Sequence, residues 1–186
     1  DNTLNTGRIY MYDHWGSLEG NNLLNKIRYM VTACGCSFII LDHISIVVSG
    51  IEEGDERRTI DNLMTKLRGL VEEVNCGLIL VSHLKRPQGN KGHEDGAQTS
   101  MSQLRGSASI GQLSDIVIGC ERDQQGDDPD RTTVRVLKNR WTGETGIACE
   151  LDYDHKTGRL TEVPLDEIPF DEEETDESWS GDSAVF

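Results

Sequence analysis

The hydrophobic residues of this chain follow two patterns along its first half. Residues 21–32 and 56–74 carry apolar side chains at intervals of three and four, which predicts two amphipathic helices. Residues 38–41 and 78–81 are wholly apolar, which predicts two buried strands. A strand, a helix and a second strand in this order are typical of a parallel βαβ unit whose sheet is covered on both faces.

The second half of the chain has shorter and more polar elements. The polar, glycine-containing stretch that follows Leu84 predicts an exposed loop, which runs to Ser100. The closely spaced late strands predict an antiparallel meander added to the parallel sheet. The predicted elements are a β-type run at 8–12, a short helix at 102–113, and strands at 116–120, 132–138, 147–153 and 159–163.

The chain has 186 residues, enough for one domain with a sizeable core. No apolar run approaches the ~20 residues that a membrane span needs, so no membrane partner is expected. The net charge is −15, but residues 160–186 contain ten Asp or Glu and no Lys or Arg. Residues 164–186 are therefore predicted to be a disordered acidic tail. The acidity of this tail does not exclude nucleic acid binding by the preceding residues.

Two polar residues lie just after the apolar strands, Asp42 directly after Leu41 and His83 after Ser82. The carboxyl ends of parallel strands meet at one edge of the sheet, where ligands bind, so Asp42 and His83 are expected at a common rim. A carboxylate there can hold the Mg²⁺ that bridges nucleotide phosphates, although Asp42 would equally cap the following turn. His83 would contact a γ-phosphate or its attacking water, or it is simply an exposed histidine.

Cationic residues form two further candidate sites. Lys85, Arg86 and Lys91 lie in the glycine-containing loop, where they would bind nucleic acid phosphates or belong to an ordinary solvated loop. Lys138 and Arg140 point to the same side of an alternating strand. Two such cations suit a polyphosphate, and a charged edge strand that resists aggregation is the alternative.

Four segments together resemble the motifs of DnaB-type hexameric replicative helicases, in the order of that family. The resemblance is closest to the helicase domain of podovirus phage primase-helicases, which are similar to the Twinkle helicase. The first segment resembles a Walker B strand, the next two resemble the motifs that follow it, and the last resembles the lysine and arginine-finger motif. They are residues 38–45, 81–86, 104–115 and 138–146.

This resemblance implies a RecA-like P-loop NTPase core of the α/β class, with a mainly parallel sheet, helices on both faces and C-terminal antiparallel strands. It implies a homo-oligomeric ring, with a hexamer expected, that uses ATP or dNTP with Mg²⁺ to move 5′ to 3′ along single-stranded DNA and unwind duplex DNA. The ring would work in the cytoplasm of a phage host. The acidic tail, which ends at Phe186, would dock a replicative DNA polymerase, and a solubilising tail without a partner is the alternative.

The resemblance also implies a role for each matching residue. Asp42 would help to hold Mg²⁺, and His83 and Gln112 would sense the γ-phosphate. Arg140 would be an arginine finger that reaches the nucleotide of a neighbouring subunit, with Lys138 beside it and Arg122 assisting. The residues expected on or near the loops of the DNA channel are Lys85, Arg86, Lys91, Arg105 and Gly106.

One family motif has no counterpart in these 186 residues, which contain no G-x-x-x-x-G-K-[ST] sequence. Residues 1–163 are therefore expected to be the C-terminal part of a helicase ATPase domain whose N-terminal part is missing. The whole protein is expected to be an active helicase and this fragment to hydrolyse ATP negligibly, because the P-loop cradles the phosphates. The alternatives are a RecA-type recombinase ATPase and a non-catalytic RecA-like module that binds partners or joins rings.

Overall fold

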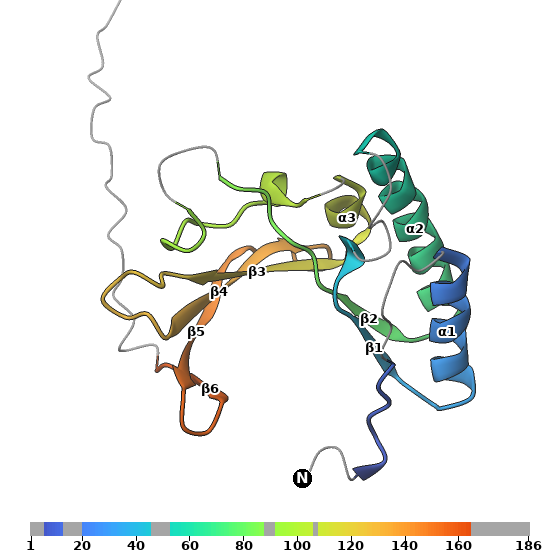
Figure 1. Cartoon of the computed structure of the whole chain (residues 1–186), viewed down its shortest axis with the longest axis horizontal. Helices are drawn as coiled ribbons and strands as arrows, with labels where there is room; N and C mark the ends of the chain where they lie inside the picture. The colour runs from blue at the N-terminus through green and yellow to red at the C-terminus, as the bar shows by residue number, and fades with distance from the viewer. Residues whose placement is uncertain (1–5, 13–19, 46–52, 88–91, 106–107, 165–186) are drawn as a thin grey trace, which may run out of the picture.

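The computed structural model describes residues 6–12, 20–45, 53–87, 92–105 and 108–164 (Figure 1). The predicted acidic tail with Phe186, together with Lys91 and Gly106, lies outside these residues. None of the described helices is long and apolar enough to cross a membrane. The elements are α1 (Gly20–Thr32), β1 (Phe38–Leu41), α2 (Glu53–Val74), β2 (Gly77–Leu80), η3 (Met101–Gln103), α3 (Ala108–Leu113), β3 (Ile116–Arg122), β4 (Arg131–Asn139), β5 (Gly146–Asp154) and β6 (Arg159–Glu162).

The first half of the chain forms the predicted βαβ unit. Strands β1 and β2 pair in parallel, with Phe38 opposite Gly77 and Leu41 opposite Leu80. Helices α1 and α2 pack against each other along one side of these strands (Figure 1). Their apolar stripes form the core because residues three and four apart share one face of a helix. The buried core contains Leu23, Ile27, Ile39, Ile44, Ile60, Leu63, Met64, Leu67, Leu70 and Ile110.

The strands β1 and β2 are covered less completely than their sequences predict. Successive side chains of a strand point to opposite faces of the sheet. Ile39 faces the core, whereas Phe38, Ile40 and Ile79 have relative exposures of 71%, 69% and 53%. The wholly apolar strands predicted a sheet that is covered on both faces. Within the described part of the chain, only one face of β1 and β2 is covered.

The second half forms the predicted antiparallel meander. Strands β3, β4, β5 and β6 pair with their neighbours in chain order. They form a sheet of their own rather than an extension of β1 and β2. Figure 1 shows this sheet beside the βαβ unit, with β3 reaching toward α2 and α3. Among the described strands, three of the four pairings are thus antiparallel.

Three local expectations differ from the structure. Residues 8–12 form no strand, and Met11 is 84% exposed, because no described strand lies beside them to complete a ladder. The helix predicted at 102–113 divides into η3 and α3, consistent with the glycines that weaken helix propensity there. The loop expected to be exposed up to Ser100 has an anchored end, since Thr99 is buried.

Candidate functional site

The carboxyl ends of β1 and β2 form the predicted rim. Asp42 directly follows β1 and is exposed, and His83 lies three residues beyond β2. Backbone hydrogen bonds continue past the strands, from Val81 N to the Leu41 oxygen (2.9 Å) and from Ile44 N to the Val81 oxygen (3.0 Å). The structure therefore brings Asp42 and His83 to one edge, as the sequence predicted.

A second histidine, which the sequence analysis missed, completes this rim. The rings of His43 and His83 meet edge to face, with 4.3 Å between their centroids. The Nδ1 atom of His43 is buried and has no hydrogen-bond partner among the described atoms. The position directly after Asp42 was the only sequence signal for His43. The contact with His83 depends on how the two strand ends are placed.

Asp42 is suited to provide one of the ligands of a magnesium ion. Mg²⁺ bound with a nucleotide commonly takes one or two protein carboxylates, and phosphates and water supply its other ligands. Within the described ranges, no group of three or more His, Cys, Asp or Glu side chains is arranged to hold a metal ion. Asp42, an exposed carboxylate at the rim, could supply one protein ligand to an ion that a nucleotide brings with it.

Three candidate DNA-binding residues, Lys85, Arg86 and Arg105, lie in the connection between β2 and α3, beside two backbone contacts that hold it. Lys85 N donates to the Gln103 oxygen (2.7 Å), and Arg105 N donates to the His83 oxygen (3.0 Å). These contacts bring Arg105 beside the rim residue His83 although 22 positions separate them in the chain. The side chains of Lys85, Arg86 and Arg105 are exposed, so they are available to an external anion.

The same connection is also hydrogen-bonded to the meander, through Thr99. Thr99 donates from its backbone nitrogen and its hydroxyl to Glu121 Oε1, both at 2.7 Å. Arg135 donates to both carboxylate oxygens of Glu121, at 2.8 and 3.1 Å. Burial disfavours the charged form of Glu121, but the hydrogen bonds from Arg135 and Thr99 outweigh it, so the pKa of Glu121 lies below its ordinary value.

Lys138 and Arg140 lie on the same side of β4 and its extension, as predicted, and both reach the C-terminal end of α3. Lys138 Nζ donates to the oxygens of Gly111 (2.8 Å) and Gln112 (3.1 Å). Arg140 donates to Asp115 Oδ1 (3.2 Å) and to the Gln112 oxygen (3.4 Å). Three predicted site residues are therefore in contact, and cations suit this helix end because its carbonyls carry partial negative charge.

Arg122 is the predicted site residue that the structure places elsewhere. It ends β3 at the opposite end from Arg140, since Ile116 is opposite Asn139 in the ladder. The seven residues of β3 span about 20 Å. The Arg122 guanidinium contacts the Pro129 oxygen and Asp130. Within one chain, Arg122 and Arg140 do not share a site.

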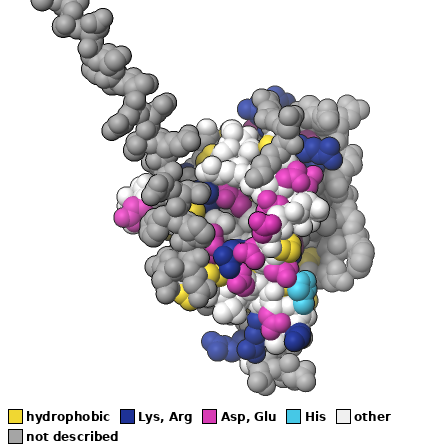
Figure 2. Space-filling model, turned by 90° about the vertical axis from the view of Figure 1, so that its left-hand side faces the viewer, with side chains coloured by type: hydrophobic (Ala, Val, Ile, Leu, Met, Phe, Trp, Pro, Cys, Tyr) yellow, Lys and Arg dark blue, Asp and Glu magenta, His cyan; other side chains and the backbone are white. Residues whose placement is uncertain are grey.

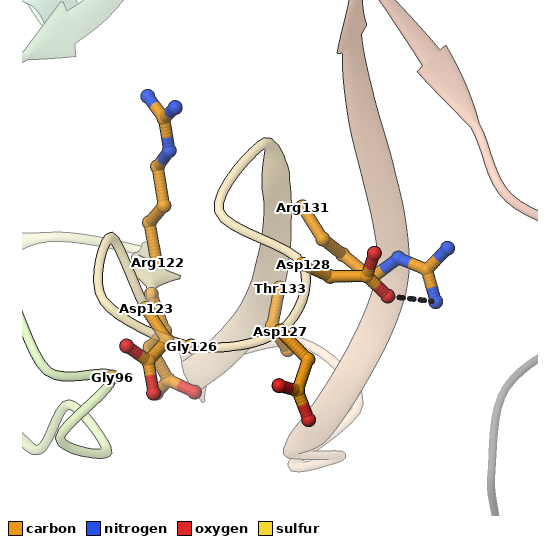
Figure 3. Close-up of a pocket in the computed structure, with 9 residues that line it drawn as sticks. Gly96, Arg122, Asp123, Gly126, Asp127, Asp128, Arg131 and Thr133 are labelled. Atoms are coloured by element: carbon orange, nitrogen blue, oxygen red, sulfur yellow. Dashed lines mark ion pairs between the residues drawn. The ribbon is translucent and has the colours of Figure 1, made fainter.

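The surroundings of Arg122 are acidic rather than suited to an anion. A pocket of about 250 Å³ opens there, and three aspartates line it beside Arg131. Figure 3 shows Arg122 pointing away from these carboxylates, which are Asp123, Asp127 and Asp128. Figure 2 shows acidic side chains spread over this face of the molecule. A nucleotide phosphate is not favoured in this pocket, because like charges repel.

The comparisons with known proteins place these features in a family. The model of the DnaB-like helicase C-terminal domain matches residues 2–162. The chain belongs to this family. It is also 44% identical over 152 residues to the DNA helicase/primase of Enterobacteria phage T3. That match covers 82% of this chain and 27% of the relative, so the chain spans about a quarter of the relative's length.

Solved structures show the same fold at lower identity. One solved ATPase domain is 20% identical with a TM-score of 0.64, and the match covers 82% of this chain and 54% of that one. A DnaB-like replicative helicase studied with its primase interactions is 18% identical, with the same score and coverage of 82% and 36%. These structures confirm the α/β, RecA-like fold, and the family model and the phage relative support the helicase family over the recombinase.

The sequence analysis did not single out two residues that lie beside Arg140. Asp115 was noted only as part of a motif, and Arg68 was not singled out within its long helix. The two contact one another at 2.5 Å, and Asp115 also contacts Arg140. No spacing rule relates these three positions, because their contact depends on how α2 packs against α3.

Proposed function

We propose that this domain is the motor part of a replicative DNA helicase, which hydrolyses ATP or dNTP with Mg²⁺ and moves 5′ to 3′ along single-stranded DNA. The observation that carries the proposal is the 44% identity over 152 residues to a phage DNA helicase/primase. Asp42 and His83 would face the nucleotide of their own subunit, with Asp42 holding Mg²⁺. Gln112 would link the nucleotide to the DNA loops.

The placement of Arg140 supports a ring in which it serves a neighbouring subunit. Its described partners belong to α3 and the turn after it, and none is a rim residue of β1 or β2. Its side chain is 48% exposed, so a neighbouring molecule can reach it. A guanidinium whose described contacts include no rim residue of its own chain would stabilise the charge that develops on a transferring phosphoryl group of the neighbouring subunit. Lys138 would assist there. Arg122 lies at the opposite end of the β3–β4 ladder, so it would act separately from Arg140.

The decisive experiment is turnover by the whole protein. We expect nucleotide hydrolysis that single-stranded DNA stimulates, together with separation of a forked duplex that has a 5′ tail. The isolated 186-residue chain serves as the comparison and is expected to hydrolyse nucleotide negligibly. A whole protein that neither hydrolyses nucleotide nor separates strands would leave only the non-catalytic module. Strand exchange without unwinding would indicate a recombinase.

The exposed cations after β2 are expected to bind DNA phosphates. Replacing Lys85 and Arg86 together with alanine should weaken single-stranded DNA binding for all sequences alike. The slope of log affinity against log salt should become shallower by about 1.4, since each phosphate contact on a single strand contributes about 0.7. Fluorescence anisotropy of a labelled oligonucleotide over a salt series measures this slope. Arg159→Ala on β6 is the control, and an unchanged slope in the double variant would contradict the placement.

Two further parts of the proposal concern partners and location. The acidic residues that end at Phe186 would dock a replicative DNA polymerase, because a basic surface complements their charge and a pocket can take an aromatic side chain. The ring would work in the cytoplasm of the phage host. Removal of residues 165–186 should weaken polymerase binding in a pull-down and leave hydrolysis unchanged.

A further inference from the structure

Asp115 holds Arg140 in two independent ways. The backbone nitrogen of Arg140 donates to the backbone oxygen of Asp115 at 2.9 Å. The guanidinium of Arg140 also pairs with Asp115 Oδ1 at 3.2 Å, and its other amino group reaches the Gln112 oxygen at 3.4 Å. Both terminal nitrogens of Arg140 are thus directed at acceptors of its own chain. An anion on a neighbouring molecule has to compete with these acceptors.

The other oxygen of the Asp115 carboxylate pairs with Arg68 of α2. Arg68 Nη1 lies 2.5 Å from Asp115 Oδ2, and Arg68 Nε is 2.9 Å from Glu72. Asp115 is therefore shared between two arginines. The Arg68 contact is the shorter one, and the Arg68 side chain is 32% exposed against 48% for Arg140. Of the two guanidinium groups, Arg140 has the longer contact and the easier route into solvent.

We propose that Asp115 is a positioning residue that retains Arg140 on its own subunit until a nucleotide phosphate of the neighbour displaces it, and that Arg68 makes this retention reversible. The inference rests on the proposed role of Arg140 toward a neighbouring nucleotide. When Arg140 leaves, Asp115 keeps its bond to Arg68, so the departure does not create an unpaired carboxylate. An exposed ion pair is weak, and a polyphosphate offers Arg140 more negative charge than one carboxylate.

This arrangement predicts opposite effects for the two partners of the carboxylate. Asp115→Asn removes the charge that retains Arg140 while preserving side-chain shape, so Arg140 should become more available. Among the described residues, Arg68→Gln leaves Arg140 as the one cation on Asp115, so the departure of Arg140 would leave a half-buried carboxylate unpaired and should become harder. In the double variant the charge on Asp115 is absent, so it should behave like Asp115→Asn. Damage to packing would instead move both single variants in the same direction.

The availability of Arg140 can be measured without activity. The whole protein, free of nucleotide and diluted below the concentration of ring assembly, is treated with phenylglyoxal, and modified arginines are quantified by mass spectrometry. Arg159 on β6 is the internal reference. We expect Arg140 to react about two- to five-fold faster in Asp115→Asn and slower by a similar factor in Arg68→Gln, the range that an exposed ion pair spans. Glu73→Gln, which removes the ion pair with Arg28, should leave the Arg140 rate unchanged.

Hydrolysis by the same variants tests the functional half of the inference. The kcat of DNA-stimulated turnover should rise by about two- to five-fold in Asp115→Asn and fall in Arg68→Gln, with the KM for nucleotide nearly unchanged. Equal labelling in all variants, or shifts of one sign, would overturn the inference. If labelling follows the expected pattern while Arg140→Ala hydrolyses normally, the proposed function of Arg140 fails, and the role of Asp115 fails with it.

Discussion

Replacing Arg140 with alanine is expected to reduce DNA-stimulated hydrolysis by the whole protein by a factor of about 10³ or more, with nucleotide binding retained. An arginine finger contributes about this much, because its guanidinium stabilises charge that develops only during phosphoryl transfer. The loss should therefore appear in kcat rather than in affinity. Steady-state hydrolysis and equilibrium binding of a labelled nucleotide, measured on the same preparation, separate the two quantities.

Mixed rings show whether Arg140 acts on its own subunit or on a neighbour. If it acts on a neighbour and the subunits fire in sequence, Arg140→Ala subunits should lower the activity of wild-type subunits more than in proportion to their fraction. Arg159→Ala, which removes an exposed arginine of β6, should leave the activity of the mixed rings unchanged at every ratio. A strictly proportional decline would argue against a contact between subunits. Normal hydrolysis by Arg140→Ala alone would refute the role of this residue.

The predictable part of the fold is the part that local periodicity determines. The stripe of α2 repeats every three to four residues, and β1 and β2 lie in short apolar runs that polar residues follow. Their order alone favoured a parallel pair with Asp42 and His83 at one rim. The side shared by Lys138 and Arg140 likewise followed from the alternation of a strand.

The remaining features depend on contacts that no local pattern contains. The meander forms a separate sheet, and the antiparallel register of β3 and β4 places Arg122 at the opposite end of the ladder from Arg140 although both are strand-end cations. The sharing of Asp115 between Arg68 and Arg140 depends on the packing of α2 against α3. The anchor of Thr99 on Glu121 joins residues 22 positions apart. Burial, rather than residue type, distinguishes this glutamate from the many exposed acids of the chain.

Glu121→Ala is expected to cost about 3–5 kcal/mol of unfolding free energy, the largest stability effect that we predict. The side chain of Glu121 is 8% exposed and accepts hydrogen bonds from Thr99 and Arg135. Its removal leaves the guanidinium of Arg135, 19% exposed, without that carboxylate, and an uncompensated charge that is largely buried is costly. Urea unfolding of the whole protein, followed by hydrogen exchange at the Thr99 amide, measures the loss and its location.

A surface carboxylate provides the matched control for this variant. Asp128 pairs with Arg131 at 3.7 Å and is 71% exposed. Asp128→Ala should change the unfolding free energy by at most about 1 kcal/mol, because an exposed pair is screened by water. If both variants cost the same, or if Thr99 exchanges at the wild-type rate in Glu121→Ala, the anchor does not stabilise this end of the connection. If the anchor does stabilise the connection, Glu121→Ala should release the Thr99 end of the candidate DNA-binding loop, and the variant should bind single-stranded DNA more weakly.

The lowered pKa of Glu121 adds a pH dependence with a definite sign. In the unfolded chain this carboxyl titrates near its ordinary value of 4.5, whereas in the folded protein it stays charged to lower pH. Its contribution to stability is therefore complete above about 4.5 and is lost as the pH falls through the folded value. The difference in unfolding free energy between wild type and Glu121→Gln should be constant from about pH 7 to 5.5 and should shrink below about 4.5.

Urea unfolding over this pH series measures the difference, in which the titration of all other acids cancels. A difference that stays constant down to about pH 3.5 would mean that charge on Glu121 does not stabilise the anchor.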